Sequence, residues 1–232
     1  QIGGFVVFYN ILTTCFLVLI TCTFAISQSS AMACDGPREV SEAKLSSIQS
    51  FIHNKKMTVF TFTGYSGAQY QKPGAMLEHA ARVLDRQNPK KTLINIGATA
   101  VGIGAIYDIA KQKGFTTMGI VSSRARDEHV TLSECVDYVF YVPDNTWGGL
   151  APGSNQLSPT STALVTVSTS LVAIGGGNVT RDEALAARAA GKPVTFIPAD
   201  MNHEIARKNA QKRGKSEPTD FRGSAHAALA DG

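Results

Sequence analysis

Residues 170–183 read SLVAIGGGNVTRDE, and they decide the predicted fold. The apolar run at 170–174 is typical of a buried strand, and the polar residues from Thr180 onward begin a helix predicted over residues 181–190. Three glycines lie between them. At such a turn the free N–H groups of the first helical turn can hold an anion. We therefore predict a phosphate-binding turn made of Gly175, Gly176, Gly177, Asn178 and Thr180.

Strands and helices alternate along the chain on both sides of this turn. Strands that are apolar throughout and alternate with helices favour a parallel sheet covered on both faces. The expected fold is therefore α/β, a three-layer Rossmann-like domain at residues 57–213. The predicted strands span residues 57–63, 92–96, 116–121, 136–142, 170–174 and 193–197, and the predicted helices span residues 73–86, 102–113 and 181–190.

Two further glycine turns follow predicted strands, at residues 63–67 (TGYSG) and 97–104 (GATAVGIG). Because ligands bind outside the carboxyl ends of parallel strands, all the glycine turns are expected to meet at one crevice. The glycine spacing is neither that of the dinucleotide fingerprint nor that of the P-loop, so each turn alone could equally be a plain connection. These turns add Gly64, Ser66, Gly97 and Gly102 to the candidate phosphate-binding residues.

The longest predicted connection, residues 143–162, is rich in Pro, Gly, Ser and Asn and carries the single tryptophan, Trp147. A connection of this length inside a domain is either a lid over a site or a flexible insertion. Residues 160–168 at its end have a composition that also allows a helix.

The two ends of the chain differ in composition from this domain. Residues 5–26 carry no charge and are long enough to cross a bilayer, so residues 1–33 are interpreted as a membrane or signal segment. If that segment is used, the protein is membrane-anchored or exported; if translation starts at Met32 or Met57, it is cytoplasmic. Residues 34–56 are predicted to form a helical linker, with its helix at 39–52, and residues 214–232 a flexible tail.

Cysteine and histidine residues show no clustering in the sequence. Cys15 and Cys22 lie in the apolar segment, and only Cys34 and Cys135 lie beyond it. We expect no disulfide framework, no CxxC metal pattern, no metal site and no cofactor. The net charge of +4 is mild, so a nucleic-acid partner is not expected.

The turn that follows the strand at 170–174 resembles a known motif. Residues 175–183 resemble the PGGxGTxxE motif of the LOG (Lonely Guy) proteins, once described as lysine decarboxylases, and more generally the SLOG superfamily of Rossmann nucleotide-binding proteins. Residues 187–197 resemble the helix end and last strand of that family. Glycine replaces the motif's proline, and Val179 replaces its last glycine. The matching residues are Gly176, Gly177, Thr180 and Glu183.

The resemblance implies a small-molecule nucleotide as ligand and a homodimer as assembly. LOG enzymes hydrolyse the N-glycosidic bond of a nucleoside 5'-monophosphate with the motif's glutamate and an arginine from an upstream Met-His-x-Arg-Lys segment. The resemblance assigns the role of the motif's glutamate to Glu183, whose carboxylate could stabilise an oxocarbenium-like ribose and orient water. The upstream segment is missing here, and Arg124 and Arg126 are the nearest basic candidates.

Several alternatives stay open. Glu183 could simply complete the helix cap, and Arg124 and Arg126 could belong to a solvated cluster with neighbouring acidic residues. A non-catalytic sensor or carrier of a nucleotide or nucleotide-derived cofactor would need no arginine. Single-strand DNA binding, as in DNA-processing protein A, would need a basic groove with stacking aromatics. An NAD dehydrogenase is disfavoured because the fingerprint is absent.

Overall fold

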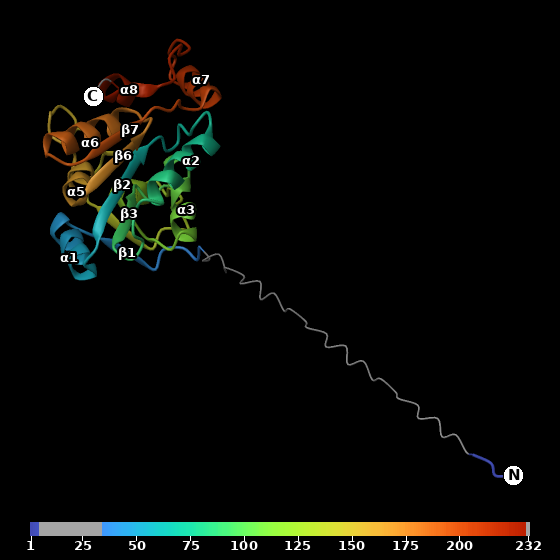
Figure 1. Cartoon of the computed structure of the whole chain (residues 1–232). Helices are drawn as coiled ribbons and strands as arrows, with labels where there is room; N and C mark the ends of the chain where they lie inside the picture. Colours follow the sequence, from blue (N-terminus) through green and yellow to red (C-terminus); the bar gives the residue numbers. More distant parts are fainter. Residues whose placement is uncertain (5–33, 231–232) are drawn as a thin grey trace. The chain divides into compact units, whose positions relative to one another are not determined.

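A parallel sheet of seven strands forms the centre of the part of the chain that the structure describes (Figure 1). The computed structural model describes residues 1–4 and 34–230, and the described residues from 34 onward form one compact unit. Neighbouring strands are parallel, in the order β1-β5-β4-β3-β2-β6-β7. The strands are β1 (Glu39–Glu42), β2 (Thr58–Gly64), β3 (Thr92–Ile96), β4 (Thr116–Ser122), β5 (Tyr138–Val142), β6 (Ser170–Ile174) and β7 (Val194–Ile197).

Helices cover both faces of this sheet (Figure 1). Apart from β1, each strand corresponds to one predicted from the sequence, so the expected three-layer α/β fold is confirmed. One face carries α1 (Leu45–Lys55), α5 (Pro159–Val167) and α6 (Asn178–Ala189), and the other carries α2 (Pro73–Leu84) and α3 (Ile106–Gln112). The shorter or peripheral helices are η1 (Gly102–Ala105), α4 (Ser123–Asp127), α7 (His203–Lys212) and α8 (Gly223–Leu229).

The direction in which the sheet grows changes at β2. From β2 the chain moves to β3 on one side, while β6 lies on the other side, with Gly64 in register with Ile174. The carboxyl ends of β2, β3 and β6 are therefore neighbours, and such a switch point is where an open parallel sheet binds ligands. The three predicted glycine turns follow these three strands.

The sheet is buried on both faces, as the apolar strands predict. Ile94 packs with α2 and α3, whereas its neighbour Leu93 packs with α1 and α5, because successive strand residues point to opposite faces. One ion pair is buried with them: Lys111 Nζ lies 2.7 Å from Asp137 Oδ1, and both side chains are nearly inaccessible to solvent. Asp137 also accepts a hydrogen bond from the N–H of Thr117, so this pair fixes the start of β5 against α3 and β4.

The predicted helical linker at residues 34–56 is only partly helical. The expected helix began at residue 39, but residues 39–42 form β1, which pairs with β5, and α1 begins at Leu45. The open edge of β5 offers hydrogen bonds that a local helical pattern cannot reveal, and this tertiary contact overrides helix propensity. Residues 34–56 are thus part of the sheet and of its helical cover.

The flexible tail predicted for residues 214–232 is also wrong in part. Residues 223–229 form α8, which packs on α6. Ala225 and Leu229 are four residues apart, and both are buried in the cluster that α6 contributes to. These two apolar side chains help dock the segment on α6, although the composition around them is polar.

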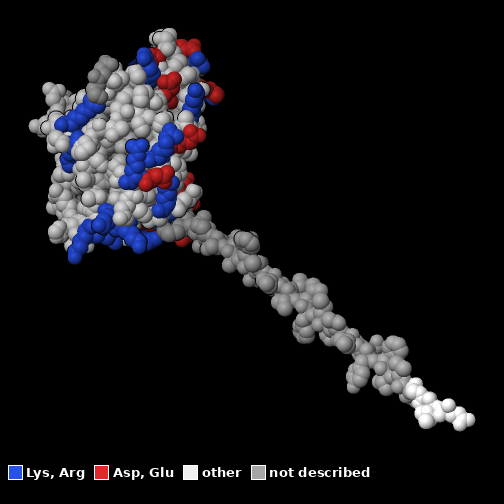
Figure 2. All heavy atoms as spheres, in the orientation of Figure 1, with Lys and Arg blue, Asp and Glu red and all other residues white. Residues whose placement is uncertain are grey.

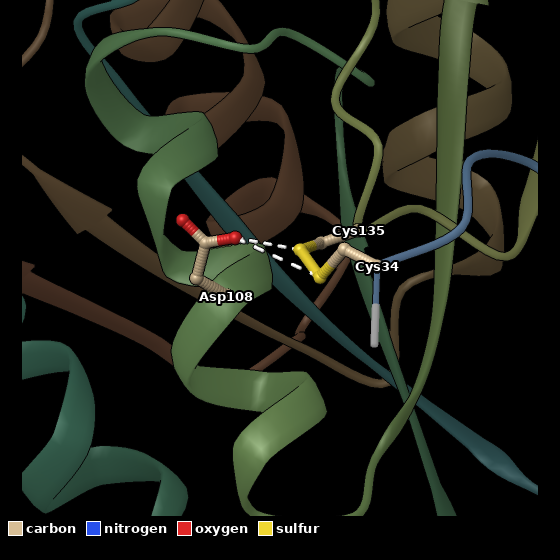
Figure 3. Close-up of side chains that lie close together, drawn as sticks. All are labelled: Cys34, Asp108 and Cys135. Atoms are coloured by element: carbon tan, nitrogen blue, oxygen red, sulfur yellow. Dashed lines mark hydrogen bonds between the residues drawn. A yellow bond between two sulfur atoms is a disulfide. The ribbon is translucent and has the colours of Figure 1, made fainter. Parts of the chain in front are cut away.

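A disulfide bond joins Cys34 to Cys135, 101 residues away in the sequence (Figure 3). The expectation of no disulfide is therefore wrong for this pair. The segment before β1 runs beside the segment before β5, where the N–H of Gly36 donates to the carbonyl of Glu134 at 2.9 Å. A carboxylate oxygen of Asp108, from α3, lies 2.6 Å from the sulfur of Cys135. The pairing follows from the β1–β5 register, which spacing alone could not show.

No helix among the described residues is long and apolar enough to span a membrane. The apolar segment predicted at residues 5–26 lies outside the described residues.

Candidate functional site

A cavity of about 450 Å³ opens at the carboxyl ends of β2, β3 and β6. The three glycine turns meet there, as the sequence predicted, together with residues from β4, α4 and α5. The predicted site residues that line it are Gly64, Ser66, Gly97, Gly177, Asn178, Thr180 and Glu183.

Gly102, Gly175 and Gly176, which were also predicted to bind phosphate, do not line the cavity. All three have positive φ, at +62°, +54° and +122°. A Cβ atom at Gly175 would lie 2.6 Å from the carbonyl oxygen of Ala199, and one at Gly176 would collide with the Thr180 side chain. The backbone conformation and the close packing therefore require glycine at these positions. The three residues determine the course of the turns without lining the cavity.

The start of α6 faces the cavity without a side-chain cap. Gly177 is the N-cap, no side chain bonds the first turn, and a Cβ atom at Gly177 would meet nothing within 4 Å. The first N–H groups of a helix have no intrahelical acceptor, and the helix dipole makes this end positive. Val179 lies inside this first turn with helical geometry, so its position does not demand the positive φ of a glycine. The turn can therefore hold an anion at the cavity wall.

Glu183 lies one turn further along α6, on the floor of the cavity. The residue is 4% exposed, and each oxygen of its carboxyl group accepts one hydrogen bond from a hydroxyl group. Thr63 donates to Oε2 at 2.9 Å, and Ser161 donates to Oε1 at 2.7 Å. These partners differ from the first-turn N–H groups that a helix-capping role would use.

Burial raises the pKa of Glu183 from 4.5 to about 7. The hydrogen bonds from Ser161 and Thr63 oppose this rise because they favour the ionised form, and the neighbouring charge of Asp182 adds to it. A carboxyl group with this pKa can hold or release a proton near neutral pH. It can also accept a further hydrogen bond from a hydroxyl of a bound molecule.

Arg124 does not meet Glu183 in the cavity. Its Nε donates to Oε1 of Glu128 at 2.6 Å, and its guanidinium lies over the ring of Trp147, 4.9 Å from the centroid. Arg126 likewise pairs with Glu42 across the surface. Among the described residues that line the cavity there is no lysine, arginine or histidine. The predicted pairing of Glu183 with Arg124 is therefore absent from this geometry.

No protein-family model matches this chain. A search of curated proteins also finds no match. Solved structures do resemble it at low identity.

The molybdenum cofactor carrier protein of Chlamydomonas reinhardtii is 19% identical, with a TM-score of 0.44 over 68% of this chain and 85% of the carrier. The protein TM1055 is 22% identical, with a TM-score of 0.43 over 60% of this chain and 72% of its own. DNA processing protein A from Streptococcus pneumoniae is 14% identical, with a TM-score of 0.43 over 76% of this chain and 62% of its own. The likeness is one of fold, and the chemistry of the site rests on this chain's own residues.

The loop at residues 143–158 is anchored beside Glu183. The N–H of Gly149 donates to the Ser161 hydroxyl at 2.7 Å, and the N–H of Leu150 donates to Asp182 at 3.1 Å. Because Ser161 in turn donates to Glu183, the loop backbone and the buried carboxyl share one hydrogen-bond chain. The sequence predicted either a lid over a site or a flexible insertion for this connection, and these hydrogen bonds favour a segment that forms part of the site wall.

The C-terminal segment, residues 221–229, holds the glycine turn from the other side. The N–H of Ala225 donates to the carbonyl of Gly176 at 3.1 Å, and the Ser224 hydroxyl donates to Asn178 at 2.7 Å. In a trans peptide the C=O and the next N–H point in opposite directions. Since Ala225 holds the carbonyl of Gly176, the N–H of Gly177 is directed away from α8.

Sequence reasoning missed Thr63 and Ser161 as partners of Glu183. A lone hydroxyl residue in a strand or a helix carries no signal of its own, so no local pattern would have found them. Trp147 was noticed only as the single tryptophan of a long loop, yet it lines the cavity.

Proposed function

We propose that the crevice binds a nucleotide or a nucleotide-derived cofactor, with a phosphate at the start of α6. The observation that carries the proposal is the uncapped first turn of α6 at a cavity wall, with the buried carboxyl of Glu183 one turn away. N–H groups at a helix start suit a phosphate, and a carboxyl flanked by hydroxyls suits the hydroxyls of a sugar. The apolar side chains of the remaining wall suit a base.

Binding without cleavage is the better supported form of this function. The LOG mechanism pairs its glutamate with an arginine, and here no cationic side chain lines the described cavity. Arg124 is engaged with Glu128 and Trp147 instead. We therefore favour a sensor or carrier.

Hydrolysis of an N-glycosidic bond is the second candidate, and one observation favours it. Glu183 is buried at the cavity floor with a pKa raised to about 7, the range in which a carboxyl group can serve as acid or base near neutral pH. In this reading Glu183 would stabilise positive charge on the ribose while the N–H groups of α6 hold the phosphate.

One experiment separates these forms. The full chain and its Glu183→Gln variant would be titrated by calorimetry with AMP, GMP, CMP and UMP, and each mixture would be assayed for free base by chromatography. Binding without base release supports the carrier or sensor. Base release that disappears in Glu183→Gln supports the hydrolase. Absence of binding to all four nucleotides contradicts a mononucleotide ligand and leaves only the nucleotide-derived cofactor.

Assembly and location remain predictions. The homodimer implied by the LOG resemblance can be checked by light scattering.

On the face shown in Figure 2, lysine and arginine side chains form separate clusters, several of them beside acidic side chains. A single-strand DNA partner would need a continuous basic track, which this face does not offer.

A further inference from the structure

We infer that Trp147 is the ring-binding subsite of the cavity, and that it stacks a planar aromatic ring of a ligand whose single phosphate lies at the start of α6. The inference rests on the proposed function and adds to it the residue that recognises the ring and the number of phosphates.

Trp147 is unusually exposed for the largest apolar side chain of the chain. It lines the cavity and keeps 47% of its accessible surface. The guanidinium of Arg124 lies 4.9 Å from its ring centroid, a cation–π contact that supports the ring. A supported aromatic ring with open cavity beside it is the arrangement that stacks a base.

The backbone on both sides of Trp147 is fixed. Asp144 Oδ1 accepts from both the N–H and the hydroxyl of Thr146 at 2.8 Å. On the other side, the N–H of Gly148 donates to that same hydroxyl oxygen at 3.1 Å, and the N–H of Gly149 donates to Ser161. The ring is therefore presented by an anchored loop, and little conformational entropy is lost when a ligand stacks on it.

The loop that carries Trp147 lies close to the start of α6, where the phosphate is proposed to bind. A Cβ atom at Gly148, the residue after Trp147, would lie 3.2 Å from Cγ1 of Val179 in the first turn of α6 and 3.8 Å from Oε1 of Glu183. The loop that carries Trp147 therefore adjoins both the start of α6 and Glu183. One mononucleotide could then place its phosphate, sugar and base against these three parts of the cavity.

The charge of the wall limits the number of phosphates. The described lining offers N–H groups and a helix end but no lysine, arginine or histidine. A triphosphate in such a cavity would add two phosphate groups for which the lining offers no cationic side chain, whereas one phosphate can be held by the N–H groups and the partial positive charge of the helix end. We expect a mononucleotide to bind more tightly than the corresponding triphosphate.

The single tryptophan of the sequence makes the test direct, since all intrinsic tryptophan fluorescence comes from this ring. The full chain would be titrated with AMP, GMP, CMP, UMP, ATP and ribose 5-phosphate. We expect at least one mononucleotide to change the emission and to bind about ten-fold or more tightly than ribose 5-phosphate, which lacks the ring. AMP should also bind more tightly than ATP.

Variants complete the test by calorimetry. Trp147→Ala should weaken mononucleotide binding about ten-fold or more and leave ribose 5-phosphate binding unchanged, while Trp147→Phe should largely restore it. Leu150→Ala, which removes another exposed apolar side chain of the same loop, is the control and should change neither.

The outcomes are distinct. If ribose 5-phosphate binds as tightly as every mononucleotide, or if Trp147→Ala weakens both equally, the ring subsite is refuted and the phosphate site survives. If ATP binds more tightly than AMP, the single-phosphate assignment is refuted. If no compound binds, the nucleotide form of the proposed function fails and this inference fails with it.

Discussion

Replacing Glu183 with glutamine should remove a fall in stability that the wild-type protein shows between pH 5 and pH 8. The folded-state pKa is about 7 and the reference value is 4.5, so the folded protein binds this proton more tightly than the unfolded chain does. The stability that the proton on Glu183 contributes is fully present below pH 4.5 and is lost as the pH rises through 7. A shift of about 2.5 units at about 1.4 kcal/mol each gives about 3 kcal/mol in total, most of it lost between pH 5 and pH 8.

The assay is urea unfolding of the wild type and of Glu183→Gln at pH 5, 6, 7 and 8. Relative to the variant, the wild type should lose about 2–3 kcal/mol of unfolding free energy across this range, or roughly 5–10 °C in Tm for a protein of this size. Glu78→Gln, at an exposed position on α2, is the matched control and should keep the wild-type profile. Parallel pH profiles for the wild type and Glu183→Gln would refute the argument that burial holds a proton on Glu183.

Three further predictions concern the framework of the site. Reduction of the Cys34–Cys135 bond should lower the unfolding free energy by about 5 kcal/mol, because the bond closes a loop of about 100 residues; free thiols at Cys34 and Cys135 in non-reducing peptide maps would contradict the bond itself. Gly223→Ala places a Cβ atom 2.5 Å from the Gly176 carbonyl at φ +70° and should weaken AMP binding in calorimetry, whereas Gly214→Ala, at φ +62° with open space around it, should cost about 1 kcal/mol of stability and leave affinity unchanged. Lys111→Met leaves a buried carboxylate without its main partner and should destabilise the fold by about 3 kcal/mol in urea unfolding, and a loss below 1 kcal/mol would show that the buried pair contributes little.

Local pattern was enough to predict most of the sheet. β2, β3, β4 and β6 are short apolar runs that end at glycine or polar residues, and each was identified within two residues of its observed bounds. Their burial on both faces explains why the run is continuous and why the parallel arrangement could be inferred. The motif around Gly177 and Glu183 placed both residues at the cavity for the same reason, since strand, turn and helix start are consecutive in sequence.

The elements that were missed depend on partners far away in the sequence. β1 is a strand because β5 offers an edge, and residues 223–229 are ordered because α6 offers an apolar face. Neither partner is visible in the local composition. The same holds for Thr63 and Ser161, whose hydroxyls reach Glu183 from another strand and another helix. Contacts between residues far apart in the sequence leave no periodic pattern in either segment, so they cannot be predicted from local sequence.

The hydrogen bond from Ala225 to Gly176 has a consequence for the order in which the protein matures. A nascent chain leaves the ribosome from its N-terminus, so β2 to β7 can pair before α8 has been released. Until then the carbonyl of Gly176 lacks the N–H of Ala225 as its donor. The hydrogen bonding of the glycine turn is therefore completed only by a segment that is synthesised after every strand of the sheet.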